Sequence, residues 1–130
     1  MTLSGTPAAQ QYQKIDTISN IEDASPHRII QMLMERALVR IGQARGYMER
    51  DEVPSKGESL GDAIDIIEGL QASLNHDADE RMSENFDALY AYMMRRLLEA
   101  NLRNDKAILD EVSALLRELK EAWDAIGDEV

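Results

Sequence analysis

Apolar residues recur three and four positions apart in four separate segments of the 130-residue chain. This spacing places the apolar side chains on one face of an α-helix. It predicts helices at about 26–48, 55–75, 80–103 and 105–126, which are joined by short polar connections. Four helices with short connections predict an all-α fold, namely an antiparallel up-and-down four-helix bundle.

Residues with capping side chains flank the predicted helices. Ser25 and Pro26 suit the N-cap and the first position of the first helix. Ser55 with Glu58 fits a capping box at the start of the second helix. The other expected caps are Asp77 or Asp79 for the third helix, Asn104 or Asp105 for the fourth, and Gly127 as its stop.

The apolar stripe of each predicted helix gives its expected core positions. Helix by helix, these are Ile29, Ile30, Leu33, Ala37, Leu38, Ile41, Ala44 and Met48; Leu60, Ala63, Ile64, Ile67, Leu70 and Leu74; Phe86, Leu89, Tyr90, Met93, Leu97 and Ala100; and Ile108, Val112, Leu115, Leu119, Ala122 and Ile126.

The third predicted helix has more apolar surface than a single core face needs. Beside its core face lies a second apolar face, formed by Ala91, Met94, Leu98 and Leu102. The two faces cover roughly 220° of the circumference, whereas a surface helix usually shows a stripe of about 100°. Either this helix is the most buried of the four or mediates self-association, or its second face is a groove for a segment of a partner. Smaller apolar sets lie off the main stripe at Met32 and Val39 on the first helix and at Ile66 on the second.

The segment before the first helix has apolar residues of its own at intervals of three, namely Tyr12, Ile15, Ile18 and Ile21. We expect residues 1–24 to form a flexible N-terminal segment, a short cap that can cover part of a bundle domain at 25–127. Such a segment is a candidate temporary cover for a partner-binding groove.

Composition narrows the classes of function. The chain is 44% hydrophobic and 30% charged, and its formal net charge is −11. This charge argues against nucleic acid and anionic membranes as partners, and favours a partner that is neutral, basic or mainly apolar. The sequence has no Cys, no signal-peptide pattern and no apolar run long enough for membrane insertion, which predicts a cytoplasmic protein.

No residue pattern typical of catalysis is found. His27 and His76 each lie near the start of a predicted helix, and we expect both to be surface or capping residues. The acidic stretch HDADE at 76–80 lacks the twelve-residue pattern of a calcium loop. The Glu-x-x-His pairs of di-iron bundles and the glycine-rich phosphate loop are also missing from the sequence. We therefore expect no enzyme activity and no catalytic, cofactor-binding or metal-binding residues.

Four stretches resemble, in the same order, the flagellar export chaperone FliS family. The stretch at 89–105, LYAYMMRRLLEANLRND, is similar to the family signature of Leu-Tyr-x-Tyr-Met, Arg-Leu, Ala-Asn and a capping Asp. The stretches similar to the first, second and last helices of the family are ASPHRIIQMLMERALVRIGQA at 24–44, SKGESLGDAIDIIEGLQASL at 55–74 and ILDEVSALLRELKEAW at 108–123. Two positions depart from the family pattern, Met34 in place of an aromatic residue and Arg36 in place of glycine. We expect these departures to alter the local shape of the groove.

The resemblance implies a non-enzymatic chaperone of the bacterial cytosol, without a cofactor. It implies binding of the disordered C-terminal segment of flagellin, prevention of premature polymerisation, and help in delivery to the flagellar type III export apparatus. Export gate components or a co-chaperone are further candidate partners, and we expect a monomer or a weak homodimer. The alternative is a regulatory or structural bundle that self-associates through its third helix. The residues expected to bind the partner are Tyr12, Ile15, Ile18, Ile21, Met32, Val39, Tyr90, Met94, Leu98, Asn101 and Leu102.

Overall fold

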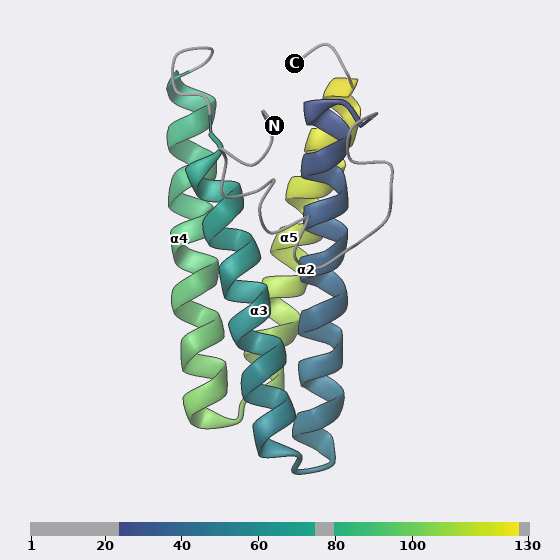
Figure 1. The fold of residues 1–130 in the computed structure, drawn as a ribbon. Coiled ribbons are helices and arrows are strands. Elements are labelled where there is room, and N and C mark those ends of the chain that lie inside the picture. The colour runs from purple at the N-terminus through teal and green to yellow at the C-terminus, as the bar shows by residue number, and fades with distance from the viewer. Residues whose placement is uncertain (1–23, 75–79, 128–130) are drawn as a thin grey trace.

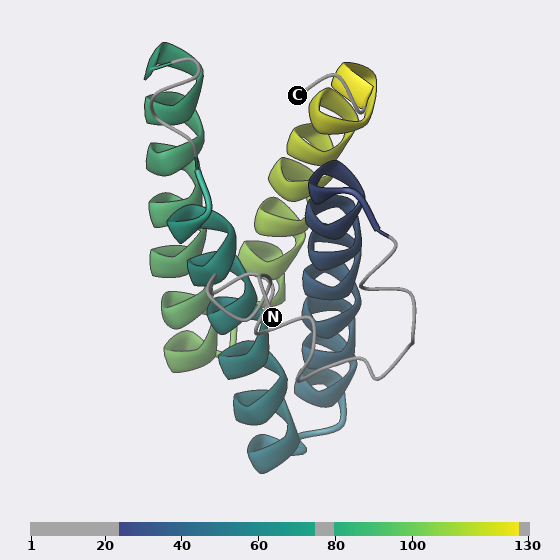
Figure 2. The same cartoon turned by 45° about the horizontal axis from the view of Figure 1, so that its top comes forward.

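A computed structural model describes residues 24–74 and 80–127. These residues form four α-helices, which are α2 (Pro26–Glu49), α3 (Val53–Ala72), α4 (Glu80–Arg103) and α5 (Lys106–Ile126). Successive helices run in opposite directions, and each packs against two neighbours (Figure 1). Two views place α3 between α2 and α4 on the near side of the bundle, with α5 behind (Figures 1 and 2). The predicted antiparallel up-and-down four-helix bundle is therefore confirmed.

The helix ends follow the predicted caps at three of four described positions. The Ser25 hydroxyl accepts a hydrogen bond from the Arg28 N–H at 3.0 Å, and α2 begins at Pro26. The Asp105 carboxylate accepts one from the Ala107 N–H at 2.9 Å, and so caps α5. Gly127 ends α5 in the left-handed region, with φ of 70°.

The start of α3 differs from its prediction. The helix begins at Val53, and its N-cap Glu52 makes no side-chain capping hydrogen bond. The expected capping box of Ser55 and Glu58 is therefore wrong, because both residues already lie inside the helix. Pro54 lies in the first turn, where its missing N–H has no intrahelical partner to lose. The helix ends at Ala72 rather than near residue 75. The predicted caps Asp77 and Asp79 lie outside the described residues.

The apolar core is wider on α2, α3 and α5 than the predicted stripe. Residues buried in addition to the predicted ones are Met34, Ile66, Leu109 and Leu116. Ala122 was expected in the core but is exposed. Each helix has two neighbours, so a side chain displaced from the stripe toward one of them is still covered. Met34 is 0% exposed, so this departure from the family pattern changes the core rather than a surface groove.

His27 is buried, and its expected surface position is wrong. Its side chain is 5% exposed and stacks on the Trp123 ring, with centroids 4.9 Å apart. The His27 Nε2 atom lies 2.7 Å from the Trp123 carbonyl oxygen, and the Trp123 indole N–H donates to the His27 carbonyl at 3.0 Å. This reciprocal contact, which we call the His27–Trp123 clasp, joins the start of α2 to the end of α5. His76 lies outside the described residues.

Candidate partner-binding surface

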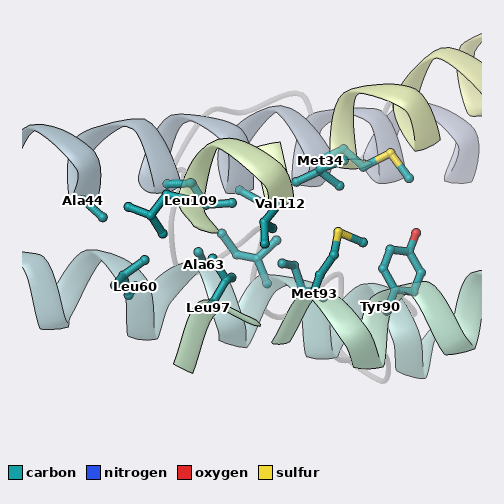
Figure 3. Close-up of a cluster of buried hydrophobic side chains, with 14 of the residues drawn as sticks. Met34, Ala44, Leu60, Ala63, Tyr90, Met93, Leu97, Leu109 and Val112 are labelled. Atoms are coloured by element: carbon teal, nitrogen blue, oxygen red, sulfur yellow. The ribbon is translucent and has the colours of Figure 1, made fainter. Parts of the chain in front are cut away.

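Helix α4 presents one buried and one open apolar face. Tyr90, Met93 and Leu97 are at most 2% exposed, and they point into the core toward Met34 and Val112 (Figure 3). On the second face the exposed fractions are 54% for Leu98 and 87% for Leu102. Ala91 and Met94, on the same face, are half-buried. The bundle therefore leaves the outer part of the second face uncovered.

Two polar contacts fix the register of α3 against α4. The Lys56 ammonium donates to the Asn101 carbonyl at 3.2 Å, and the Gln71 amide donates to the Asp87 carboxylate at 2.7 Å. Positions 63 and 64 lie at the middle of the α3 span between Lys56 and Gln71, and position 94 lies midway between the two α4 residues. Ile64 therefore lies level with Met94 across the two antiparallel helices.

Helical spacing places further residues on the same side of α3. Ile64 precedes Gln71 by seven residues, which is two helical turns, so both face α4. Gly57 precedes Ile64 by seven, and Gly61 precedes it by three. A Cβ added at either glycine would meet no atom within 4 Å, so this part of the surface is open. We define the α3–α4 apolar surface as Val53, Gly57, Gly61, Ile64, Ala91, Met94, Leu98 and Leu102.

Two other residues expected to bind the partner lie elsewhere. Met32 and Val39 are on α2, which contacts α3 and α5, so α3 stands between them and α4 (Figure 1). Val39 is 49% exposed, whereas Met32 is half-buried against the core. The structure therefore does not gather the expected residues into one compact patch, and a partner contacting all of them has to pass over α3.

Tyr90, which was expected both on the core face of α4 and among the partner-binding residues, is buried. Its side chain is 2% exposed and packs edge-on against Phe86, with ring centroids 6.1 Å apart. Burial raises the pKa of its hydroxyl, which therefore stays neutral. Tyr90 is a core residue in this structure. Asn101 is half-buried, and its carbonyl is held by Lys56. The expected residues Tyr12, Ile15, Ile18 and Ile21 lie outside the described residues.

The opposite side of α4 is occupied by contacts with α5. The Tyr92 hydroxyl donates to the Glu111 carboxylate at 2.5 Å, and the Arg96 guanidinium donates to it at 3.0 Å. These hydrogen bonds hold the pKa of Glu111 below its ordinary value. Arg96 also pairs with Glu99 at 2.6 Å. Polar side chains therefore close the α4–α5 seam, and the apolar surface is confined to the α3 side.

Acidic side chains border the α3–α4 apolar surface, a feature that net charge alone could not locate. Glu58, Asp65 and Glu68 are exposed on the solvent face of α3. These three residues are seven and three positions apart in the sequence, which places them on one face of a helix. That spacing was the sequence signal for an acidic row. On α4, the Arg95 guanidinium lies over the Tyr92 ring, 5.7 Å from its centroid.

A metal site and a membrane-spanning helix are both missing from the described part of the chain. Within residues 24–74 and 80–127, no cluster of three or more His, Asp or Glu side chains is arranged to hold a metal ion. In the same residues, no helix has the length and apolar character of a membrane span. Along α3 and α4, the described residues instead present exposed apolar side chains, namely Val53, Leu98 and Leu102.

Comparison with known proteins identifies relatives along almost the whole chain. Residues 8–130 match the family model described as flagellar protein FliS. The chain is 50% identical over 120 residues to the flagellar secretion chaperone FliSB of Pseudomonas aeruginosa, which covers 92% of this chain and 95% of the relative. It is 42% identical over 127 residues to the flagellar secretion chaperone FliS of Salmonella typhimurium, with coverages of 97% and 92%. The Bacillus subtilis chaperone of that name is 33% identical over 105 residues, with coverages of 81% and 77%. The chain therefore belongs to the FliS family of flagellar proteins.

Proposed function

We propose that this protein is a cytosolic flagellar secretion chaperone that binds the C-terminal segment of flagellin. By covering that segment it prevents premature polymerisation and assists delivery to the flagellar type III export apparatus. The chaperone names of its relatives support this role. The observation that carries the proposed mode of binding is the exposed second face of α4, where Leu98 and Leu102 are 54% and 87% exposed.

A disordered segment suits this distribution of exposed side chains. Leu98 lies beside α3, and Val39 lies beyond α3 on α2. A chain that folds on binding can extend over both places, whereas a compact partner cannot follow the curved bundle surface as easily. Such a segment loses conformational entropy as it binds, which keeps the complex reversible enough for release. Met94 adds a flexible side chain that can adapt to different apolar residues.

Adjacent leucines provide a sharp test of the binding surface. Leu97 is 0% exposed and Leu98 is 54% exposed, although the two residues are neighbours in α4. We expect Leu98→Asp to abolish binding of a flagellin C-terminal peptide and to leave Tm near the wild-type value. Leu97→Asp should instead unfold the bundle, since it buries a charge. Ala114→Asp, on the exposed face of α5, is the matched control and should change neither property.

Calorimetry and circular dichroism measure the two readouts. The wild-type protein is expected to bind the peptide one to one, with a gain in helix on mixing. Failure to bind at peptide concentrations of tens of micromolar would refute the proposed function. Sedimentation tests the alternative role, because a tight dimer that does not respond to flagellin indicates a self-associating bundle.

The N-terminal segment has a proposed role of its own as a competing cover. Deleting residues 1–21 removes Tyr12, Ile15, Ile18 and Ile21 and should raise the affinity for the flagellin peptide. Unchanged or weaker binding by the deletion variant contradicts this role. Export gate components and a co-chaperone are further proposed partners, which pull-downs with the purified flagellin complex can test.

A further inference from the structure

We infer that the segment bound on the α3–α4 apolar surface is an amphipathic helix with a row of basic side chains beside its apolar strip. The inference rests on the proposed function, because it describes the chemistry of the flagellin segment that this surface accepts. It places the basic row over the solvent face of α3 and the apolar strip against Ile64, Met94 and Leu98.

The solvent face of α3 carries uncompensated negative charge. The helix contains four acidic residues and one basic residue, Lys56. The Lys56 ammonium is turned toward the end of α4, where it donates to Asn101 and Asn104. Asp62 is paired with Arg40 of α2 at 3.0 Å. The remaining acids of this helix are Glu58, Asp65 and Glu68, and none of them forms an ion pair with another residue that the structure describes.

These carboxylates run along the edge of the apolar surface. Glu68 follows Ile64 by four residues, and Asp65 follows Gly61 by four, so each acid is a surface neighbour of an apolar position. Glu58 precedes Gly61 by three and continues the row. The side chains absent at Gly57 and Gly61 leave room for another helix to approach α3 closely. A helix seated there therefore has one flank within reach of the acidic row.

Charge complementarity selects the occupant. A partner helix with Lys or Arg on that flank gains attraction to three carboxylates, whereas acidic side chains there are repelled. A second copy of this chain fits poorly, because a two-fold contact through this face brings the same acidic row of each copy to one interface. The row lies at the exposed rim of the surface, so its attraction should weaken as salt is added.

Charge reversal on α3 tests the inference with the flagellin C-terminal peptide as the probe. The double variant Asp65→Lys/Glu68→Lys should bind about tenfold more weakly at low ionic strength, since two rim attractions become repulsions and tenfold corresponds to 1.4 kcal/mol. Its affinity should also depend less on salt. The matched control is Glu118→Lys/Glu121→Lys, which makes the same change in net charge at exposed positions of α5 and should bind like the wild type.

The outcomes separate this inference from the proposed function. If the wild type binds and both double variants lose equal affinity, total charge governs binding and the inference is overturned, while the proposed function stands. If the wild type does not bind flagellin, the proposed function fails. Two synthetic helical peptides then decide the inference, because they share one leucine strip and carry either lysines or glutamates on its flanks. A preference for the lysine peptide that falls only in the α3 variant supports the inference, and an equal preference in both variants overturns it.

Discussion

The contact of Lys56 with the end of α4 is a buried interaction whose removal should be measurable. The Lys56 side chain is 8% exposed, although lysine is rarely buried without a partner. Its ammonium donates to the Asn101 carbonyl at 3.2 Å and to the Asn104 side-chain oxygen at 3.0 Å. Lys56→Met keeps the aliphatic stem and removes both hydrogen bonds. It also leaves a carbonyl in the last turn of α4 without its donor.

The expected loss of stability follows from these two contacts. A hydrogen bond with a charged donor contributes about 1.5–3 kcal/mol when it is well protected from water. Asn104 is exposed, so its contact is counted at about 1 kcal/mol. The free energy of unfolding of Lys56→Met should therefore fall by about 2.5–4 kcal/mol. For a chain of 130 residues this lowers Tm by about 9–15 °C.

Urea unfolding followed by circular dichroism measures the change, with Lys106→Met as the control. Lys106 is exposed and lies 3.5 Å from Glu49, so its loss should change the free energy of unfolding by less than about 0.5 kcal/mol. A second cycle uses Asn104, whose φ of 54° is more easily adopted by glycine. Asn104→Gly should be more favourable in the Lys56→Met background than in the wild type, by about 1 kcal/mol. Additive effects, or a Lys56→Met variant as stable as Lys106→Met, refute this account of the end of α4.

Three other predictions concern different parts of the bundle. Gly61→Ala should raise the free energy of unfolding by about 0.5–1 kcal/mol in urea melts, because the added Cβ meets no atom within 4 Å; a destabilised variant contradicts the open space at Gly61. Trp123→Phe keeps a ring beside His27 but removes the indole N–H bond to its carbonyl, and should lower the free energy of unfolding by about 1 kcal/mol. The pKa of Glu111 is lower in the folded state than in the unfolded state. Its contribution to stability is therefore fully present above the unfolded pKa and is lost as pH falls through the folded pKa. Glu111→Gln should therefore flatten the fall of Tm below about pH 4.3, and an unchanged acid profile excludes this contribution.

The fold was largely predictable from the sequence, because local signals and helical period agree. As predicted, α2 begins after its N-cap Ser25, and α5 begins after Asp105 and ends at Gly127. Each of these residues supplies the capping geometry itself. The start of α3 was not predictable in the same way, because Val53 begins a helix whose N-cap makes no side-chain hydrogen bond. Burial of Ile66 also depends on tertiary packing, since a helical wheel does not show where the second neighbour lies.

The candidate site was only partly predictable. The sequence assigned Tyr90 to the core face of α4 and Leu98 to its second face, and the structure buries the first and exposes the second. Polar residues such as Lys56 and His27 are usually exposed, so residue type alone favours a surface position for both. Their burial follows from specific partners far away in the sequence, which only the folded chain brings together.

The His27–Trp123 clasp links the first turn of α2 to the last turns of α5, so we expect neither of these two helix ends to fray independently. Opening α2 at His27 breaks the indole hydrogen bond of Trp123, and unwinding α5 at Trp123 removes the stacked ring and the carbonyl partner of His27. Helix ends normally exchange their amide hydrogens by small local openings, each independent of the other. We therefore expect these two helix ends, 96 residues apart in the chain, to open together. Over the described residues, the helices therefore form a closed ring in which the first and last of the four are joined at their outer ends.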